Sequence, residues 1–89
     1  MEFNGALVKT ADKTIGIAVV SDHFLQLSAQ ERVQLMKQYG TAFPQTPFVL
    51  LLQNEEGESK FFGRPDLIAL LAEIPLTYIT WKTFVTKEE

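Results

Sequence analysis

Two short segments of this chain are apolar at almost every position, Thr14 to Val20 (TIGIAVV) and Phe48 to Gln53 (FVLLLQ). A strand with one face in water alternates apolar and polar residues, whereas a strand covered on both faces does not. We therefore predict two strands that are buried on both faces. The first of them is expected to lie in the centre of a sheet.

Each buried strand is expected to have a hairpin partner. Phe3 to Lys9 precedes the first strand across the short polar segment Thr10 to Lys13, and Glu58 to Phe62 follows the second across a turn that ends at Gly57. Both arrangements are typical of antiparallel hairpins. Leu76 to Thr86 (LTYITWKTFVT) is rich in β-branched and aromatic residues, which predicts a fifth strand.

Two helices are expected between these strands. Leu25 to Tyr39 contains the capping-box sequence Ser28-Ala29-Gln30-Glu31, and Gly40 stands where a left-handed residue often ends a helix. The second helix is expected to begin at Pro65, because proline is favoured at the first helical position, and to stop at Pro75.

The 89 residues are therefore predicted to form one α+β domain, β-β-α-β-β-α-β, with a mixed, mostly antiparallel sheet and two packed helices. Adjacent strand residues face opposite ways, so only one of Phe61 and Phe62 is expected to enter a one-sided core. The predicted core consists of Ile15, Ile17, Val19, Val33, Met36, Val49, Leu51, Leu67, Leu70, Leu71, Ile79 and Trp81.

Part of the chain resembles a known fold. Tyr39-Gly40, a short loop, Pro47 and the apolar strand from Phe48 are followed by a strand that closes at Phe61-Phe62-Gly63 and by the helix at Pro65. From Arg32 to Leu71 this order resembles the C-terminal half of the thioredoxin fold. The resemblance implies a cis peptide bond between Thr46 and Pro47. It implies a binding or adaptor role without redox chemistry, because the chain has no CxxC motif.

Composition excludes several classes of function. The chain has no cysteine, which removes disulfides, thiolate chemistry and sulfur-based metal sites. Its eight Lys and Arg residues are scattered singly in a chain of net charge −3, whereas nucleic-acid binding needs clustered cations. The longest apolar runs, Pro47 to Leu52 and Leu67 to Ala72, are far shorter than the about 20 residues of a membrane span. We expect a cytoplasmic protein without cofactor, nucleic-acid partner or membrane partner.

His23 is the only histidine, and Ser21-Asp22-His23 contains the three residue types of a hydrolase triad. Three successive residues cannot place the base between nucleophile and acid, so we expect a turn start with His23 exposed. The group Glu55-Glu56-Gly57-Glu58 lacks the ligand spacing of a calcium loop and predicts a solvated hairpin tip. No catalytic, cofactor-binding or metal-binding residue is assigned.

Arg64 precedes the predicted second helix, where backbone amides favour anions. Pro65 removes one of these amides and Asp66 supplies negative charge, so a local pair between Arg64 and a carboxylate is favoured over anion binding. Arg64 and His23 are kept as candidate contacts for an anion or another ligand.

The predicted last strand carries Tyr78 and Phe84 on the face opposite Ile79 and Trp81. A second subunit would cover that face, and about 800 Å² per subunit suffices for a stable contact. We expect a homodimer with Tyr78 and Phe84 at its interface. The leading hypothesis is a non-enzymatic protein-interaction module. The alternative is a small ligand-binding domain or enzyme with a pocket near His23 or Arg64.

Overall fold

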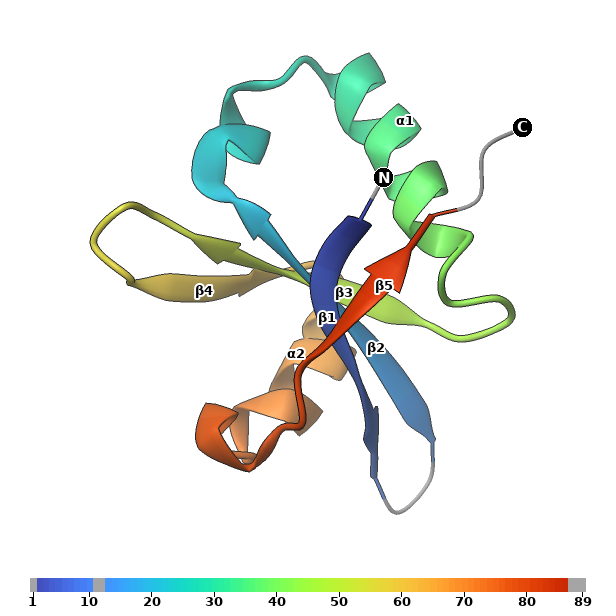
Figure 1. Ribbon diagram of the computed structural model, residues 1–89, viewed down its shortest axis with the longest axis vertical. Coiled ribbons are helices and arrows are strands. Elements are labelled where there is room, and N and C mark those ends of the chain that lie inside the picture. The colour runs from blue at the N-terminus through green and yellow to red at the C-terminus, as the bar shows by residue number, and fades with distance from the viewer. Residues whose placement is uncertain (1, 11–12, 87–89) are drawn as a thin grey trace.

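The computed structural model describes residues 2–10 and 13–86 (Figure 1). The predicted α+β fold and the order β-β-α-β-β-α-β are confirmed, and two short 3₁₀ helices, η1 and η2, are added. The elements are β1 (Glu2–Lys9), β2 (Thr14–Ser21), η1 (Asp22–Gln26), α1 (Ala29–Gly40), β3 (Phe48–Gln53), β4 (Ser59–Phe62), α2 (Pro65–Ala72), η2 (Leu76–Tyr78) and β5 (Lys82–Val85).

The five strands form one mixed sheet in the order β4-β3-β2-β1-β5. β2 and β3 are parallel, with Ile17 opposite Val49, and the other three pairs are antiparallel. A parallel pair needs a crossover connection, and η1 and α1 provide it. β2 lies in the centre of the sheet, as predicted, and β4 and β5 are its two edges.

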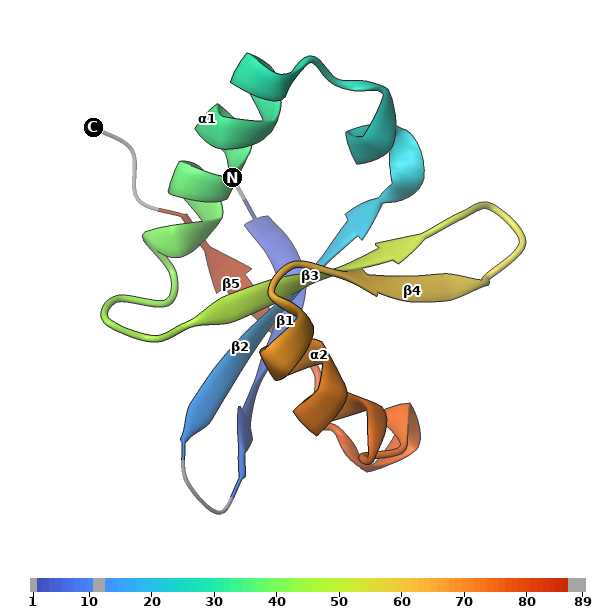
Figure 2. The ribbon, with the colours of Figure 1, turned by 180° about the vertical axis from the view of Figure 1, so that it is seen from behind.

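α1 and α2 lie on opposite faces of the sheet, which gives the domain three layers (Figures 1 and 2). Each face therefore has its own core. The α2-side core contains Ala6, Val8, Ile15, Ile17, Val49, Leu51, Leu67, Leu71 and Ile79. The α1-side core contains Phe3, Ala18, Phe24, Tyr39, Phe43, Leu50 and Leu52.

This layering explains why the central strands do not alternate. Ile15 and Ile17 point to the α2-side core, and Ala18 points to the α1-side core. Phe61 and Phe62 face opposite ways, as predicted, but each contributes to a core, because the sheet is covered on both faces. Phe61 packs against the α2-side core and Phe62 against the α1-side core, and both are half-buried.

Aromatic rings dominate the α1-side core. The ring of Phe3 lies 4.9 Å from that of Tyr39, nearly perpendicular to it, and 5.7 Å from that of Phe84 in a stacked arrangement. Both geometries are favourable for aromatic pairs. Burial raises the pKa of the Tyr39 phenol, because the charged phenolate is poorly solvated there.

The start of α1 is confirmed in detail. Ser28 Oγ accepts a hydrogen bond from the Glu31 N–H, and the Glu31 carboxylate accepts one from the Ser28 N–H, which completes the capping box. The predicted left-handed cap at Gly40 is wrong. The helix ends with Gly40 and is capped by Thr41 at φ −66°, and the left-handed residue of the following loop is Gln45 at φ 58°.

The fifth strand is shorter than predicted. Leu76 to Tyr78 form η2 rather than strand, and pairing with β1 begins only at Lys82. Pro75 starts the 3₁₀ turn, in which the Tyr78 N–H donates to the Pro75 carbonyl at 2.9 Å. Tyr78 and Phe84 therefore do not share one strand face.

The core prediction is wrong at three positions. Leu70, Val33 and Trp81 are exposed, whereas Met36 and Val19 are half-buried and the other seven predicted residues are buried. On α1 the half-buried and buried side chains are those of Arg32, Leu35, Met36 and Tyr39, which share one face at helical spacing. Val33 lies beside this face and reaches solvent.

No cis peptide bond occurs in residues 2–10 and 13–86. The Thr46–Pro47 bond is therefore trans, and the cis bond implied by the resemblance is absent. The Pro47 carbonyl accepts a hydrogen bond of 2.8 Å from the Gly16 N–H, which fixes the loop after α1 to the start of β2.

Candidate functional site

A polar cleft lies at the carboxyl ends of the parallel strands β2 and β3. Ser21 ends β2 opposite Gln53 at the end of β3, and the cleft beyond them has a volume of about 700 Å³. Ligands of α/β sheets often bind at this end of parallel strands. The cleft is lined by Val19, Val20, Ser21, Asp22, His23, Gln26, Gln53, Asn54, Glu55 and Glu56.

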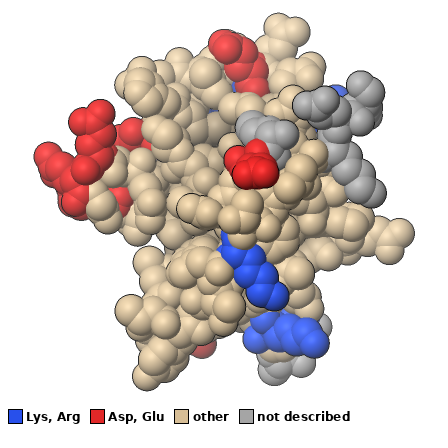
Figure 3. Space-filling view, in the orientation of Figure 1, with Lys and Arg blue, Asp and Glu red and all other residues tan. Residues whose placement is uncertain are grey.

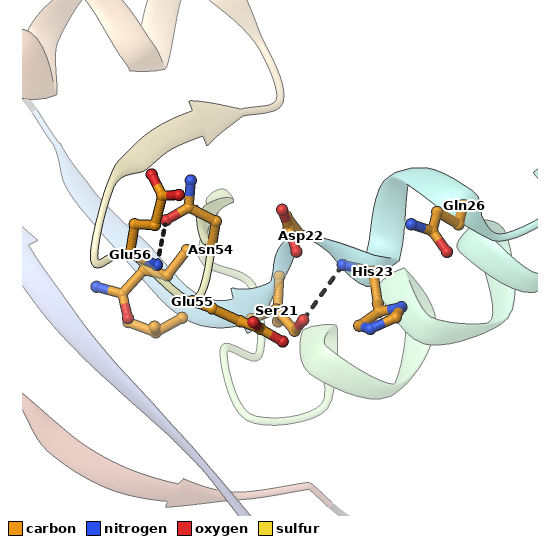
Figure 4. A pocket seen from close by; sticks show the side chains of 10 residues that line it. Ser21, Asp22, His23, Gln26, Asn54, Glu55 and Glu56 are labelled. Carbon is orange, nitrogen blue, oxygen red and sulfur yellow. Dashed lines mark hydrogen bonds between the residues drawn. The ribbon is translucent and has the colours of Figure 1, made fainter.

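Two polar side chains of this cleft accept hydrogen bonds from backbone N–H groups around it. Ser21 Oγ accepts a hydrogen bond of 3.2 Å from the His23 N–H and so caps η1 (Figure 4). Asn54 Oδ1 accepts from the N–H groups of Glu56 and Glu58 at 3.0 Å and shapes the β3–β4 turn. Such side chain-to-backbone bonds are typical of caps and Asx turns.

His23 is exposed on the wall of this cleft, as predicted. The Asp22 carboxylate and the His23 imidazole point in different directions, so Ser21, Asp22 and His23 do not form a triad (Figure 4). In the part of the chain that the structure describes, no three His, Asp or Glu side chains converge as metal ligands.

Arg64 forms the predicted local ion pair. Its Nη2 donates to Asp66 Oδ2 at 2.8 Å and its Nε to Asp66 Oδ1 at 3.2 Å, in the bidentate geometry that arginine and carboxylate prefer. The hydrogen bond from Arg64 holds the pKa of the Asp66 carboxyl below its usual value. Arg64 and His23 line different hollows, so the structure does not bring these two candidates together.

A second, apolar hollow lies between α1 and β4. We call it the α1–β4 groove; it has a volume of about 400 Å³ and is lined by Phe24, Arg32, Val33, Met36, Lys37, Phe48 and Phe62. An adjoining hollow of about 610 Å³ shares Met36, Phe48 and Phe62 with it and continues around the end of β4 to Arg64 and Ile68.

The floor of the groove consists of aromatic rings, and its rim carries two cations. The rings of Phe24 and Phe62 lie 5.3 Å apart, edge to face. The Arg32 guanidinium lies 5.7 Å from the centre of the Phe24 ring, and its Nη2 donates to the Leu25 carbonyl. Arg32 Nε is buried without a hydrogen-bond partner. Val33 is 53% exposed at the edge of the groove.

The sequence did not identify this groove. Its residues come from η1, α1, β3 and β4, and the sequence pattern at Val33, Met36 and Phe48 predicts only core or strand positions. Of the two expected interface residues, Tyr78 is 80% exposed on η2, whereas Phe84 packs against the α1-side core.

Three acidic side chains lie close together at one corner of the domain. Figure 3 shows them at left, over the β3–β4 turn that carries Glu55, Glu56 and Glu58. The turn is exposed, as the sequence predicts for a hairpin tip.

Comparison with known proteins finds no match: no family model, curated protein or solved structure is similar to this chain at a significant level. Neither α-helix within residues 2–10 and 13–86 has the length and hydropathy needed to cross a membrane.

Proposed function

We propose that this protein is a non-enzymatic protein-interaction module that binds its partner through the α1–β4 groove. The observation that supports this most directly is the apolar groove surface formed by the exposed Val33 together with the half-buried Met36, Phe48 and Phe62. Contiguous apolar surface of this kind is typical of interaction sites, because its exposure to water is unfavourable and a partner removes that exposure.

The position of the groove supports the same function. It lies beside β4, which is an edge strand of the sheet that residues 2–10 and 13–86 form. A peptide segment can add to such an edge through main-chain hydrogen bonds while its side chains enter an adjacent apolar hollow. Arg32 and Lys37 on the rim would favour acidic groups flanking the apolar anchor of a partner.

The test compares two variants of α1 that introduce the same charge. Val33→Glu places a carboxylate in the groove, and Gln34→Glu places one on the same helix at an exposed residue outside it. Both residues are exposed, so folding should be preserved in both variants. Each variant is used to capture proteins from a lysate of the cells that make this protein. The captured proteins are quantified by mass spectrometry.

We expect Val33→Glu to capture at least about tenfold less of a partner protein that the unmodified protein and Gln34→Glu both retain. Equal capture by all three proteins would place the binding surface elsewhere. The absence of any captured protein above background would contradict the interaction function itself.

The alternative function is a small ligand-binding domain or enzyme at the polar cleft. It is supported by the position of the cleft at the carboxyl ends of β2 and β3, with His23 on its wall. A thermal-shift screen of phosphates, nucleotides and metabolites tests it. A shift of several degrees that His23→Ala abolishes and Arg64→Ala preserves would favour the cleft over the groove.

A cytoplasmic location and the absence of a nucleic-acid partner are part of the proposal. The scattered cations of the chain support the second point. Fluorescence anisotropy with labelled duplex and single-stranded DNA at low salt, and imaging of a fluorescent fusion in cells, are the measurements that check them.

A further inference from the structure

We infer that the open edge of β4 pairs with β4 of a second copy of this chain, with Phe61 opposite the partner's Phe61. The inference rests on the proposed function, because it takes the side of the domain around the α1–β4 groove to be an interaction surface. It specifies one partner, a second copy, and one register.

The backbone of β4 determines which residues can pair outward. The Asn54 N–H donates to the Glu58 carbonyl at 3.0 Å, so these two residues begin the hydrogen-bonded pairs of the β3–β4 hairpin. Such pairs alternate along antiparallel strands, so Lys60 and Phe62 also turn their backbone groups toward β3. Phe61 therefore turns its N–H and C=O to the open edge of the sheet.

A symmetric antiparallel register can be centred on any residue of β4 (Ser59–Phe62), but only the registers centred on Lys60 and on Phe61 pair three β4 residues of each copy, whereas the other two pair one. The register centred on Lys60 places this residue opposite the partner's Lys60. Like charges directly opposite each other destabilise a strand pair. The register centred on Phe61 pairs as many β4 residues and avoids this juxtaposition.

The same register creates favourable pairs on both faces of the sheet. Phe61 lies on the α2 side, where the two rings would meet at the two-fold axis. Phe62 lies on the α1 side, where the partner's Lys60 would lie directly opposite it, beside the α1–β4 groove. Aromatic pairs and a cation over an aromatic ring are each stabilising.

Charge complementarity points to the same arrangement. Glu58 would lie across from the partner's Arg64, and the two-fold axis repeats the pair. The rest of the acidic turn, with the exposed residues Glu55 and Glu56, would extend toward the same end of the partner. Arg64 is exposed, and its ion pair with Asp66 leaves it accessible to a second carboxylate.

The other edge of the sheet lacks this complementarity. β5 (Lys82–Val85) carries one cation and no acidic residue to pair with it. Pairing through β4 would make one continuous sheet from the two five-stranded sheets, with closed two-fold symmetry. Both α1–β4 grooves would then lie on the same face, on either side of the axis.

The absence of cysteine makes disulfide trapping a direct test of register. Single-cysteine variants Phe61→Cys, Lys60→Cys and Lys82→Cys are oxidised and analysed without reductant. Residues opposite each other in a hydrogen-bonded antiparallel pair, as proposed for Phe61, have Cα atoms about 5.5 Å apart, within disulfide range. We expect Phe61→Cys to form covalent dimer at least about tenfold faster than the other two. Faster trapping of Lys60→Cys or Lys82→Cys, or trapping of none, would overturn the inference.

A charge exchange tests the same interface without altering Phe61. Glu58→Arg and Arg64→Glu should each weaken the dimer by about tenfold, and the double variant should recover most of that loss. Glu73→Arg, an exposed change at the C-terminal end of α2, is the control. Light scattering coupled to size exclusion should give the unmodified protein twice the 10.1 kDa mass of one chain.

The outcomes separate this inference from the proposed function. A mass of one chain at micromolar concentration, together with a partner lost only from Val33→Glu, would overturn the dimer and leave the interaction module standing. A dimer that traps at Phe61, together with capture unaffected by Val33→Glu, would support the β4 pairing and remove the groove as the binding surface. If light scattering gave the double variant a mass no higher than that of either single variant, this would contradict the Glu58–Arg64 pairing.

Discussion

The ring of Phe43 occupies the space directly over Gly16 in β2. A Cβ atom at residue 16 would lie 2.6 Å from Cδ1 of that ring, nearer than nonbonded carbon atoms can approach. Gly16 is therefore required by packing between the loop after α1 and the central strand. The Gly16 N–H also donates to the Pro47 carbonyl in the same loop.

Gly16→Ala should therefore destabilise the domain. We expect a loss of about 1–3 kcal/mol in the free energy of unfolding, because the Phe43 ring must move within a packed core. Gly40→Ala is the matched control: its Cβ would lie 3.5 Å from the Phe48 ring, an ordinary contact, and alanine is the better helix former by about 1 kcal/mol. Urea unfolding followed by circular dichroism measures both. Similar losses in the two variants would contradict the steric argument.

Phe84 and Tyr78 should differ strongly in their effect on stability. Phe84 contacts the rings of Phe3 and Phe43 in the α1-side core, so Phe84→Ala should cost about 2–4 kcal/mol. Tyr78 is 80% exposed, so Tyr78→Ala should change stability by less than about 0.5 kcal/mol. Denaturant titration at two protein concentrations is the measurement. If Tyr78→Ala caused a large loss in the free energy of unfolding, and this loss grew with protein concentration, Tyr78 would lie at a subunit interface.

The capping box should contribute measurably to α1. Ser28→Ala removes the oxygen that accepts from the Glu31 N–H and should cost about 1 kcal/mol. Glu31→Gln keeps a side-chain oxygen that can accept from the Ser28 N–H, so it should cost less. Gln30→Ala, at an exposed position between them, is the control. Equal effects of Ser28→Ala and Gln30→Ala would exclude a capping contribution.

The parts of the fold that the sequence predicts well depend on local patterns. The apolar run from Phe48 to Gln53 predicts β3 with its observed bounds, because burial on both faces removes alternation. Ser28 and Glu31 predict the start of α1, because the capping box involves only residues three positions apart. Pro65 likewise begins α2.

The errors occur where tertiary packing overrides local preference. Leu76 to Tyr78 have strand-like composition, but Pro75 starts a 3₁₀ turn and Ile79 is buried beneath α2. Arg32 shares the face of α1 that holds Met36, and because it is charged, the apolar pattern of the helix does not predict its partial burial. The α1–β4 groove joins residues from four elements, so no sequence spacing predicts it.

Acid should reduce stability in part through Asp66. Its pKa in the folded protein is held below the ordinary value of 3.8, mainly by the hydrogen bond from Arg64. The ionised carboxylate therefore stabilises the fold at pH values above 3.8, and this contribution is lost as pH falls below 3.8 toward the folded-state pKa. Asp66→Asn should be less stable than the unmodified protein near neutral pH, and the two should converge in acid.

Urea midpoints from about pH 6 to about pH 2 measure that difference for Asp66→Asn. Glu73→Gln, which removes an exposed carboxyl at the other end of α2, is the control. Because the Arg64–Asp66 pair is exposed, added salt should shrink the Asp66→Asn difference at neutral pH. A difference that persists unchanged through the acidic range would show that Asp66 acts through packing or local backbone geometry rather than through its charge.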